Sequence, residues 1–211
     1  FARQIGATDI IVVGSTSLPA DIGHYGFQDL LLLRKQIEDA GLSCAAIEGS
    51  PPDWTDKIKL GLPGRDEQID NWCKTLRNAG AAGIPIMHYS FKLRSKGGGY
   101  GLRTSRTTPS RGGAKVSSFD YDLIKGATQA YWDPPVSESK EITDEQMWDN
   151  VTYFLKAVIP VAEQAGVRMG LHPDDPPISP IGGVARIFRS HSAMKRLTEI
   201  VPSDSNGLVF C

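Results

Sequence analysis

Residues 143–177 read TDEQMWDNVTYFLKAVIPVAEQAGVRMGLHPDDPP, and this stretch decides the fold. Thr143 and Gln146 stand three residues apart, as in a capping box that begins a helix. The apolar residues that follow share one helical face as far as Gly166: Met147, Val151, Phe154, Leu155, Val158 and Ala162. The short apolar run Val167–Leu171 comes next and is typical of a buried strand. The stretch therefore predicts a helix, then a strand, then a polar loop that starts at His172.

The same helix-then-strand order recurs along the chain. It is found at Gln28–Ala40 with Leu42–Ile47, at Ile69–Leu76 with Ile84–Tyr89, and at the two ends, at Phe1–Ile5 with Asp9–Val13 and at Ser192–Val201 with Leu208–Cys211. Five strands separated by four helical segments imply parallel pairing with right-handed crossovers. The predicted fold class is therefore α/β, either a doubly wound sheet or a (β/α)8 barrel. Both architectures carry their active sites at the carboxyl ends of the strands.

One long segment, residues 92–142, interrupts this order with a Gly- and Arg-rich sequence that has neither a helical nor a strand period. Between Lys92 and Lys115 it contains seven basic residues and no Asp or Glu: Lys92, Arg94, Lys96, Arg103, Arg106, Arg111 and Lys115. Gly97–Gly101 lacks the GxGxxG spacing, so a Rossmann dinucleotide site is not expected. A connection of this length is either a solvated flexible loop or a lid that brings cations to an anionic small molecule.

Composition limits the remaining classes of protein. The 211 residues are 40% hydrophobic and 22% charged, which is typical of a globular chain. Twenty-three basic and 24 acidic residues give a net charge of -1, so neither nucleic acid nor an anionic membrane is an expected partner. Three widely spaced cysteines favour a reducing cytoplasm over a disulfide framework or a zinc knuckle. Because residue 1 is Phe rather than Met, we also treat the chain as a possible fragment.

Several candidate site residues follow the predicted strands. His172 and Asp174 come directly after one strand and Cys211 after the next, and imidazole, carboxylate and thiolate are all ligands for a divalent ion. The alternatives are a plain turn for the His172 segment and a buried apolar cysteine. Glu48 ends the second strand, where it could bind a sugar hydroxyl or remain a solvated carboxylate. Tyr89 ends the third strand beside His88, as a substrate contact or as a half-buried aromatic residue.

The residues from Phe154 to Pro177 closely resemble mannonate dehydratase, a family of the xylose-isomerase-like (β/α)8 superfamily. The resemblance extends through Ile181–Arg189 and Asn206–Cys211, and more weakly through Arg34–Glu48 and Thr75–Phe91. It implies a partial (β/α)8 TIM barrel, with residues 1–211 as one incomplete domain. Residues 92–142 are then a long loop or a lid inserted within that domain. The resemblance also implies dehydration of D-mannonate, a sugar acid, to 2-keto-3-deoxy-D-gluconate in glucuronate catabolism, with Mn²⁺ or Fe²⁺ as cofactor.

The resemblance assigns roles to particular positions. His172 and Cys211 become the expected metal ligands. The strand-end positions and the basic segment add Glu48, Tyr89, Arg103, Arg106 and Asp174 as the expected substrate-binding residues. Ser90 departs from the family pattern, which has Asn there. Family members continue for three further strands that carry the remaining ligands and acid–base groups, so we expect this chain alone to be inactive and the complete protein to form a homo-oligomer. The alternatives are a sugar isomerase or epimerase of the same superfamily and a non-catalytic sugar-acid binding protein.

Overall fold

The computed structural model describes residues 1–20, 22–93, 103–123, 141–180 and 184–211. Five strands form one sheet in the order β1-β2-β3-β6-β7, and every neighbouring pair is parallel. The strands are β1 (Asp9–Val13), β2 (Ser43–Glu48), β3 (Ile86–Tyr89), β6 (Arg168–Leu171) and β7 (Asn206–Leu208). Successive strands of the sheet lie side by side, as in a portion of a (β/α)8 barrel, and the predicted α/β class is confirmed.

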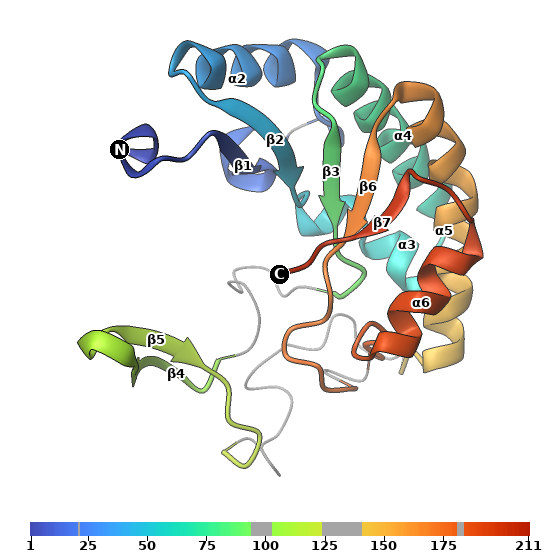
Figure 1. Ribbon diagram of the computed structural model, residues 1–211. Helices are drawn as coiled ribbons and strands as arrows, with labels where there is room; N and C mark the ends of the chain where they lie inside the picture. Colours follow the sequence, from blue (N-terminus) through green and yellow to red (C-terminus); the bar gives the residue numbers. More distant parts are fainter. Residues whose placement is uncertain (21, 94–102, 124–140, 181–183) are drawn as a thin grey trace.

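Helices cover the convex side of the curved sheet (Figure 1). The helices of the described ranges are α1 (Gly14–Ser17), which directly follows β1, and α2 (Phe27–Asp39), α3 (Asp56–Leu60), α4 (Arg65–Ala81), α5 (Asp144–Ala165) and α6 (His191–Ile200). Short 3-10 turns lie at Ala2–Ile5, Pro52–Trp54 and Arg111–Gly113. None of the helices in the described ranges is long and apolar enough to cross a membrane.

The central helix α5 forms as its sequence predicts. The Thr143 side chain accepts a hydrogen bond from the Gln146 amide, and the Gln146 side chain accepts one from the Thr143 amide. This capping box satisfies two amides that would otherwise lack helical partners. The apolar face of α5 is buried against α4 and the sheet, where the Phe154 ring lies 5.8 Å from that of Tyr89. The core therefore lies between the sheet and this helix layer.

The predicted strand at the C-terminus is shifted. β7 begins at Asn206 and ends at Leu208, so of the predicted Leu208–Cys211 only Leu208 belongs to it. The Asn206 side chain donates to the carbonyls of Leu197 and Val201 at the end of α6, which fixes where the strand starts. The apolar residues that suggested a buried strand are instead exposed, with 46% of Leu208 and all of Phe210 accessible.

The expectation that residues 92–142 lack regular structure is wrong in part. β4 (Ser105–Pro109) and β5 (Lys115–Ser118) form an antiparallel two-stranded sheet, which we call the basic arm together with its flanking residues, 103–120. Its strands are rich in Ser, Thr and basic residues and have no apolar alternation, so periodicity did not reveal them. The remaining basic residues of this segment, Arg94 and Lys96, and the stretch Gly97–Gly101 lie outside the described residues.

Candidate functional site

One row of paired residues crosses the concave face of the sheet near its carboxyl edge. Glu48 of β2 pairs with His88 of β3, His88 pairs with Gly170 of β6, and Gly170 pairs with Gly207 of β7. Paired residues in a sheet share a face, so the four positions lie on the side away from the helices. Two of the four are glycines, so only β2 and β3 contribute side chains among them, and Val13 of β1 continues the row beside Glu48. The sequence therefore places an acid and an imidazole beside two glycines of the neighbouring strands.

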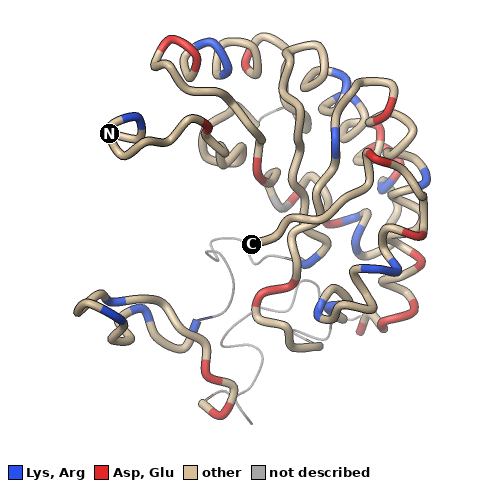
Figure 2. The backbone as a smooth tube through the Cα atoms, in the orientation of Figure 1, with Lys and Arg blue, Asp and Glu red and all other residues tan. Residues whose placement is uncertain are grey.

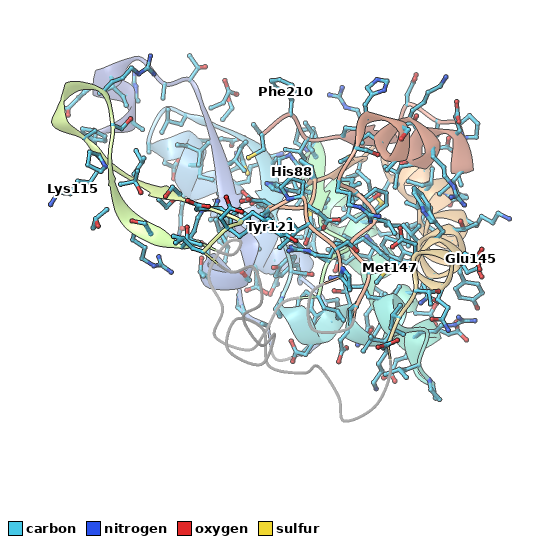
Figure 3. All side chains as sticks on the ribbon, turned by 90° about the horizontal axis from the view of Figure 1, so that it is seen from below. His88, Lys115, Tyr121, Glu145, Met147 and Phe210 are labelled. Atoms are coloured by element: carbon cyan, nitrogen blue, oxygen red, sulfur yellow. The ribbon has the colours of Figure 1, made fainter. Side chains whose placement is uncertain are left out.

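His88 is the best-enclosed polar side chain of this row. It is only 9% exposed, and Figure 3, which looks from the carboxyl edge, places it near the middle of the molecule. A side chain at Gly170 would come within 3.3 Å of the His88 ring, so the glycine leaves the space that the imidazole occupies. Burial lowers the pKa of His88, and His172 lowers it further, whereas the Glu48 carboxylate opposes the shift. His88 is therefore neutral near pH 7 and can accept or donate a hydrogen bond.

His172 follows β6 and remains in the sheet ladder, because its amide donates to the Tyr89 carbonyl at 2.8 Å. Its ring Nδ1 lies 2.7 Å from the Pro173 carbonyl oxygen. A carbonyl only accepts, so Nδ1 carries the hydrogen and Nε2 of the neutral ring keeps its lone pair. Metal-ligating histidines are oriented in this way. The geometry suits the predicted ligand role of His172.

Cys211 lies three residues past β7, and the chain reaches it along the same edge, since the Val209 amide donates to the Leu171 carbonyl at 2.9 Å. Its thiol is free and exposed, in contrast to the buried thiols of Cys44 and Cys73. Within the described ranges no group of three or more His, Cys, Asp or Glu side chains is arranged to hold a metal ion. His172 and Cys211 thus lie toward the same edge of the sheet and carry donor atoms of the kind that the expected ligand role requires.

Asp174 does not face the open side of the sheet, although the sequence suggested a substrate contact. Its side chain is 3% exposed, accepts a hydrogen bond from the Phe188 amide at 2.8 Å, and lies 3.7 Å from Nε of the buried Arg186. The Asp174 amide also donates to the Phe188 carbonyl. The carboxylate therefore fastens the loop after β6 to residues 184–188, and a substrate has no access to it.

Tyr89 is likewise directed to the helix side. Successive residues of a strand point to opposite faces, so Tyr89 and His88 cannot both face the substrate. The Tyr89 ring packs against Phe154 and lines a cavity between β3 and helices α3–α5. Burial raises the pKa of Tyr89, and its hydroxyl has no hydrogen-bond partner among the described residues. Its position does not support direct contact with a substrate at the concave face, to which the neighbouring His88 is directed.

The basic arm brings cations to the carboxyl-edge side of the barrel. Figure 2 shows its basic residues along a segment that projects from the sheet, and Figure 3 shows Lys115 at its outer end. Arg106 lies on β4 with an exposed side chain. Arg103 is instead engaged: its two Nη atoms donate to the two carboxylate oxygens of Asp175, at 3.0 and 2.6 Å.

Asp175 and Lys92 belong to the same neighbourhood and were not among the predicted site residues. Burial raises the pKa of Asp175, but the hydrogen bond and charge of Arg103 and the charge of Lys92 outweigh it, so the pKa is lowered. Lys92 is 5% exposed, and its carbonyl accepts from Nζ of Lys59. The signal for Asp175 was present in the HPDDPP run, but the sequence does not tell which of its two carboxylates faces outward.

Comparisons with known proteins show which family and which relatives this chain is similar to. The family model described as D-mannonate dehydratase (UxuA) matches residues 2–211. The chain is 33% identical to mannonate dehydratase of Streptococcus pneumoniae over 201 residues, covering 87% of this chain and 53% of that protein. It is 32% identical to mannonate dehydratase of Thermotoga maritima, covering 99% of this chain and 62% of that protein. The chain thus spans a little over half the length of the curated relatives it matches.

Solved structures agree with the sequence relatives. The crystal structure of mannonate dehydratase from Streptococcus suis superposes with a TM-score of 0.82 at 31% identity, covering 98% of this chain and 57% of that one. A D-psicose 3-epimerase structure superposes with a TM-score of 0.56 at 12% identity, covering 97% of this chain and 53% of that one. At that identity the second likeness shows the fold alone.

Proposed function

The chain belongs to the D-mannonate dehydratase (UxuA) family, and on that premise we propose that its protein dehydrates D-mannonate to 2-keto-3-deoxy-D-gluconate in glucuronate catabolism. The family match over residues 2–211 carries the proposal, together with identities of 32–33% to two mannonate dehydratases. The geometry supports it, because polar side chains gather at the carboxyl edge and cations lie beside them. The substrate class is accordingly a sugar acid.

Mn²⁺ or Fe²⁺ is the cofactor that the proposal requires. Nε2 of His172 and the thiolate of Cys211 would hold the ion, with other ligands from outside the described residues. When bound, the ion supplies positive charge that stabilises the anion formed as the proton α to the carboxylate is removed. The Pro173 carbonyl supports this role, because it fixes the His172 tautomer that leaves Nε2 free.

Other residues of this chain would bind and orient the substrate. Glu48 lies on the concave face, where its carboxylate can accept a hydrogen bond from a sugar hydroxyl, and the neutral His88 ring beside it can do the same. Arg106 of the basic arm offers an exposed guanidinium for the substrate carboxylate. We place the groups that remove the α-proton and protonate the leaving hydroxyl past Cys211, and we expect the 211-residue chain to be inactive by itself.

We also propose that residues 1–211 belong to a single barrel domain in which residues 92–142 act as a lid. The free thiols of Cys44, Cys73 and Cys211 favour a reducing, cytoplasmic location. Both sheet edges, β1 and β7, carry exposed apolar side chains, 54% of Ile11 and 46% of Leu208. Such surface favours association, either with further strands of the same barrel or in a homo-oligomer.

The decisive experiment is an assay of the full-length protein with D-mannonate and Mn²⁺, followed by detection of the 2-keto acid product. We expect product formation that His172→Ala abolishes and that the control His191→Ala, on the exposed start of α6, leaves unchanged. Interconversion of a ketose with its epimer or aldose, without loss of water, would indicate a sugar isomerase or epimerase instead. Binding of D-mannonate without turnover of any sugar would indicate a binding protein.

A further inference from the structure

The Arg103–Asp175 ion pair joins two segments that are 72 residues apart in the sequence. Both guanidinium nitrogens at the end of Arg103 donate, one to each carboxylate oxygen, at 3.0 and 2.6 Å. Such bidentate pairs combine charge with a fixed planar geometry, and Lys cannot reproduce them. The contact is therefore specific in direction as well as attractive.

Asp175 is presented from a loop that is fastened on its other side. Asp174 and Phe188 exchange two hydrogen bonds, one through the Asp174 amide at 2.9 Å and one through the Asp174 carboxylate at 2.8 Å. The Asp175 carbonyl accepts from Nη2 of Arg186 at 3.3 Å. The loop that begins at His172 is thus held in place by contacts that do not involve Arg103.

The basic arm has little packing of its own. From Arg106 to Ser117 every side chain except Thr108 is exposed. Apart from the Arg103–Asp175 pair, the hydrogen bonds that residues 104–118 make within the described ranges stay inside the arm. An isolated two-stranded sheet is at best marginally stable in water, and these exposed strands bury little apolar surface. The position of the arm relative to the barrel therefore depends on what fastens its base.

We propose that Arg103 is a positioning residue, whose ion pair with Asp175 fastens the basic arm beside the His172 loop at the carboxyl edge of the sheet. The guanidinium that the sequence suggested as a substrate contact is then occupied by Asp175. The role of Arg103 is to place the remaining cations of the arm, Arg106, Arg111 and Lys115, on the side of the barrel where a sugar acid would bind. The fastening itself stands on the contacts above, and only its consequence for substrate rests on the proposed function.

Hydrogen exchange of the full-length protein tests the fastening directly. The variants are Arg103→Gln, Asp175→Asn, the double variant and Arg103→Lys. The control is Glu199→Gln, which removes an exposed carboxylate from a different ion pair, on α6. Partly exposed ion pairs contribute up to about 1 kcal/mol, so we expect about fivefold faster exchange of the β4 and β5 amides in either single variant. The double variant should be no faster than the single ones, because the same contact is lost. Arg103→Lys should fall between wild type and Arg103→Gln.

Three outcomes would overturn the proposal: unchanged exchange in the arm, additive effects in the double variant, or equal acceleration of the β3 and β6 amides, which would indicate general destabilisation. The link to substrate has a separate test in the full-length protein, where Arg103→Gln should raise KM for D-mannonate more than it lowers kcat. A full-length protein that has no activity on D-mannonate would refute the proposed function, but the exchange result would still stand for the fastening.

Discussion

Replacement of Asp174 by alanine should destabilise the fold, because this carboxylate supports two buried groups. The substitution leaves the Phe188 amide without its 2.8 Å side-chain acceptor and removes the carboxylate 3.7 Å from the buried Arg186 guanidinium. An unsatisfied buried donor costs about 1–3 kcal/mol, and loss of one partner of a buried ion pair about 3–5 kcal/mol. Arg186 retains other contacts, including the Asp175 carbonyl, so we expect a total near the lower values, about 3 kcal/mol.

Equilibrium unfolding in guanidinium chloride, followed by tryptophan fluorescence, measures this loss. For a chain of this size, 3 kcal/mol corresponds to a fall in Tm of about 6–12 °C. Asp174→Asn keeps an oxygen that can accept from the Phe188 amide but removes the charge, so its cost should be smaller, about 1–2 kcal/mol. Asp149→Ala, on the exposed side of α5, is the control and should stay within about 0.5 kcal/mol of wild type.

The opposite pattern would refute this reasoning. If Asp174→Ala unfolds like wild type, and the same change in the full-length protein abolishes binding of D-mannonate, then Asp174 contacts substrate as the sequence suggested. If Asp174→Ala loses stability while Asp174→Asn stays folded and binds D-mannonate, then Asp174 fastens the loop after β6 to residues 184–188.

Three further predictions concern other parts of the molecule. Because burial lowers the pKa of His88 below its ordinary value of 6.5, the unfolded chain takes up this proton more readily than the folded one. The free energy of unfolding should therefore fall as pH drops below about 6.5, and His88→Gln should flatten that part of the stability–pH curve. If the curve of His88→Gln has the same slope as that of wild type, the prediction is contradicted. Gly80→Ala should destabilise by about 1–3 kcal/mol, although alanine favours helices, because the new methyl group would lie 2.2 Å from the Ala165 carbonyl oxygen; a raised Tm would refute the close approach. The 211-residue chain should bind Mn²⁺ weakly in calorimetric titration, since His172 and Cys211 are two ligands of an incomplete set, and a Kd tighter than about 1 μM would show that other groups complete it.

Hydrophobic periodicity was sufficient to predict the barrel segments except the C-terminal strand, whose predicted range overlaps β7 only at Leu208. The helical face from Met147 to Ala162 and the apolar run after Gly166 correspond to α5 and β6, with the capping box as predicted. Helices and strands of this kind are specified locally, by spacing and by end signals. The carboxyl-edge placement of His172 follows from parallel pairing alone.

Side-chain direction was harder to predict where neighbouring residues have similar chemistry. Asp174 and Asp175 are adjacent carboxylates, yet one is enclosed with Arg186 and the other faces Arg103, and only the tertiary packing decides between them. His88 and Tyr89 point to opposite faces because strands alternate, but both are aromatic, so the sequence does not say which faces the helices. The strands of the basic arm carry no apolar alternation that could have revealed them.

The basic arm lies within the connection between β3 and α5, so its residues belong to none of the strands and helices of the barrel. The strand pair β3–β6 and the helix α5 that covers it are formed by residues on either side of the connection. Chain-closure entropy grows only with the logarithm of loop length, so doubling this connection would cost about 0.6 kcal/mol. Insertions, deletions or replacement of the whole arm are therefore tolerated by the sheet, provided that its base keeps a partner for Asp175. On the proposed function, exchange of this one segment would change substrate preference, while the strands and helices beneath it remain as they are.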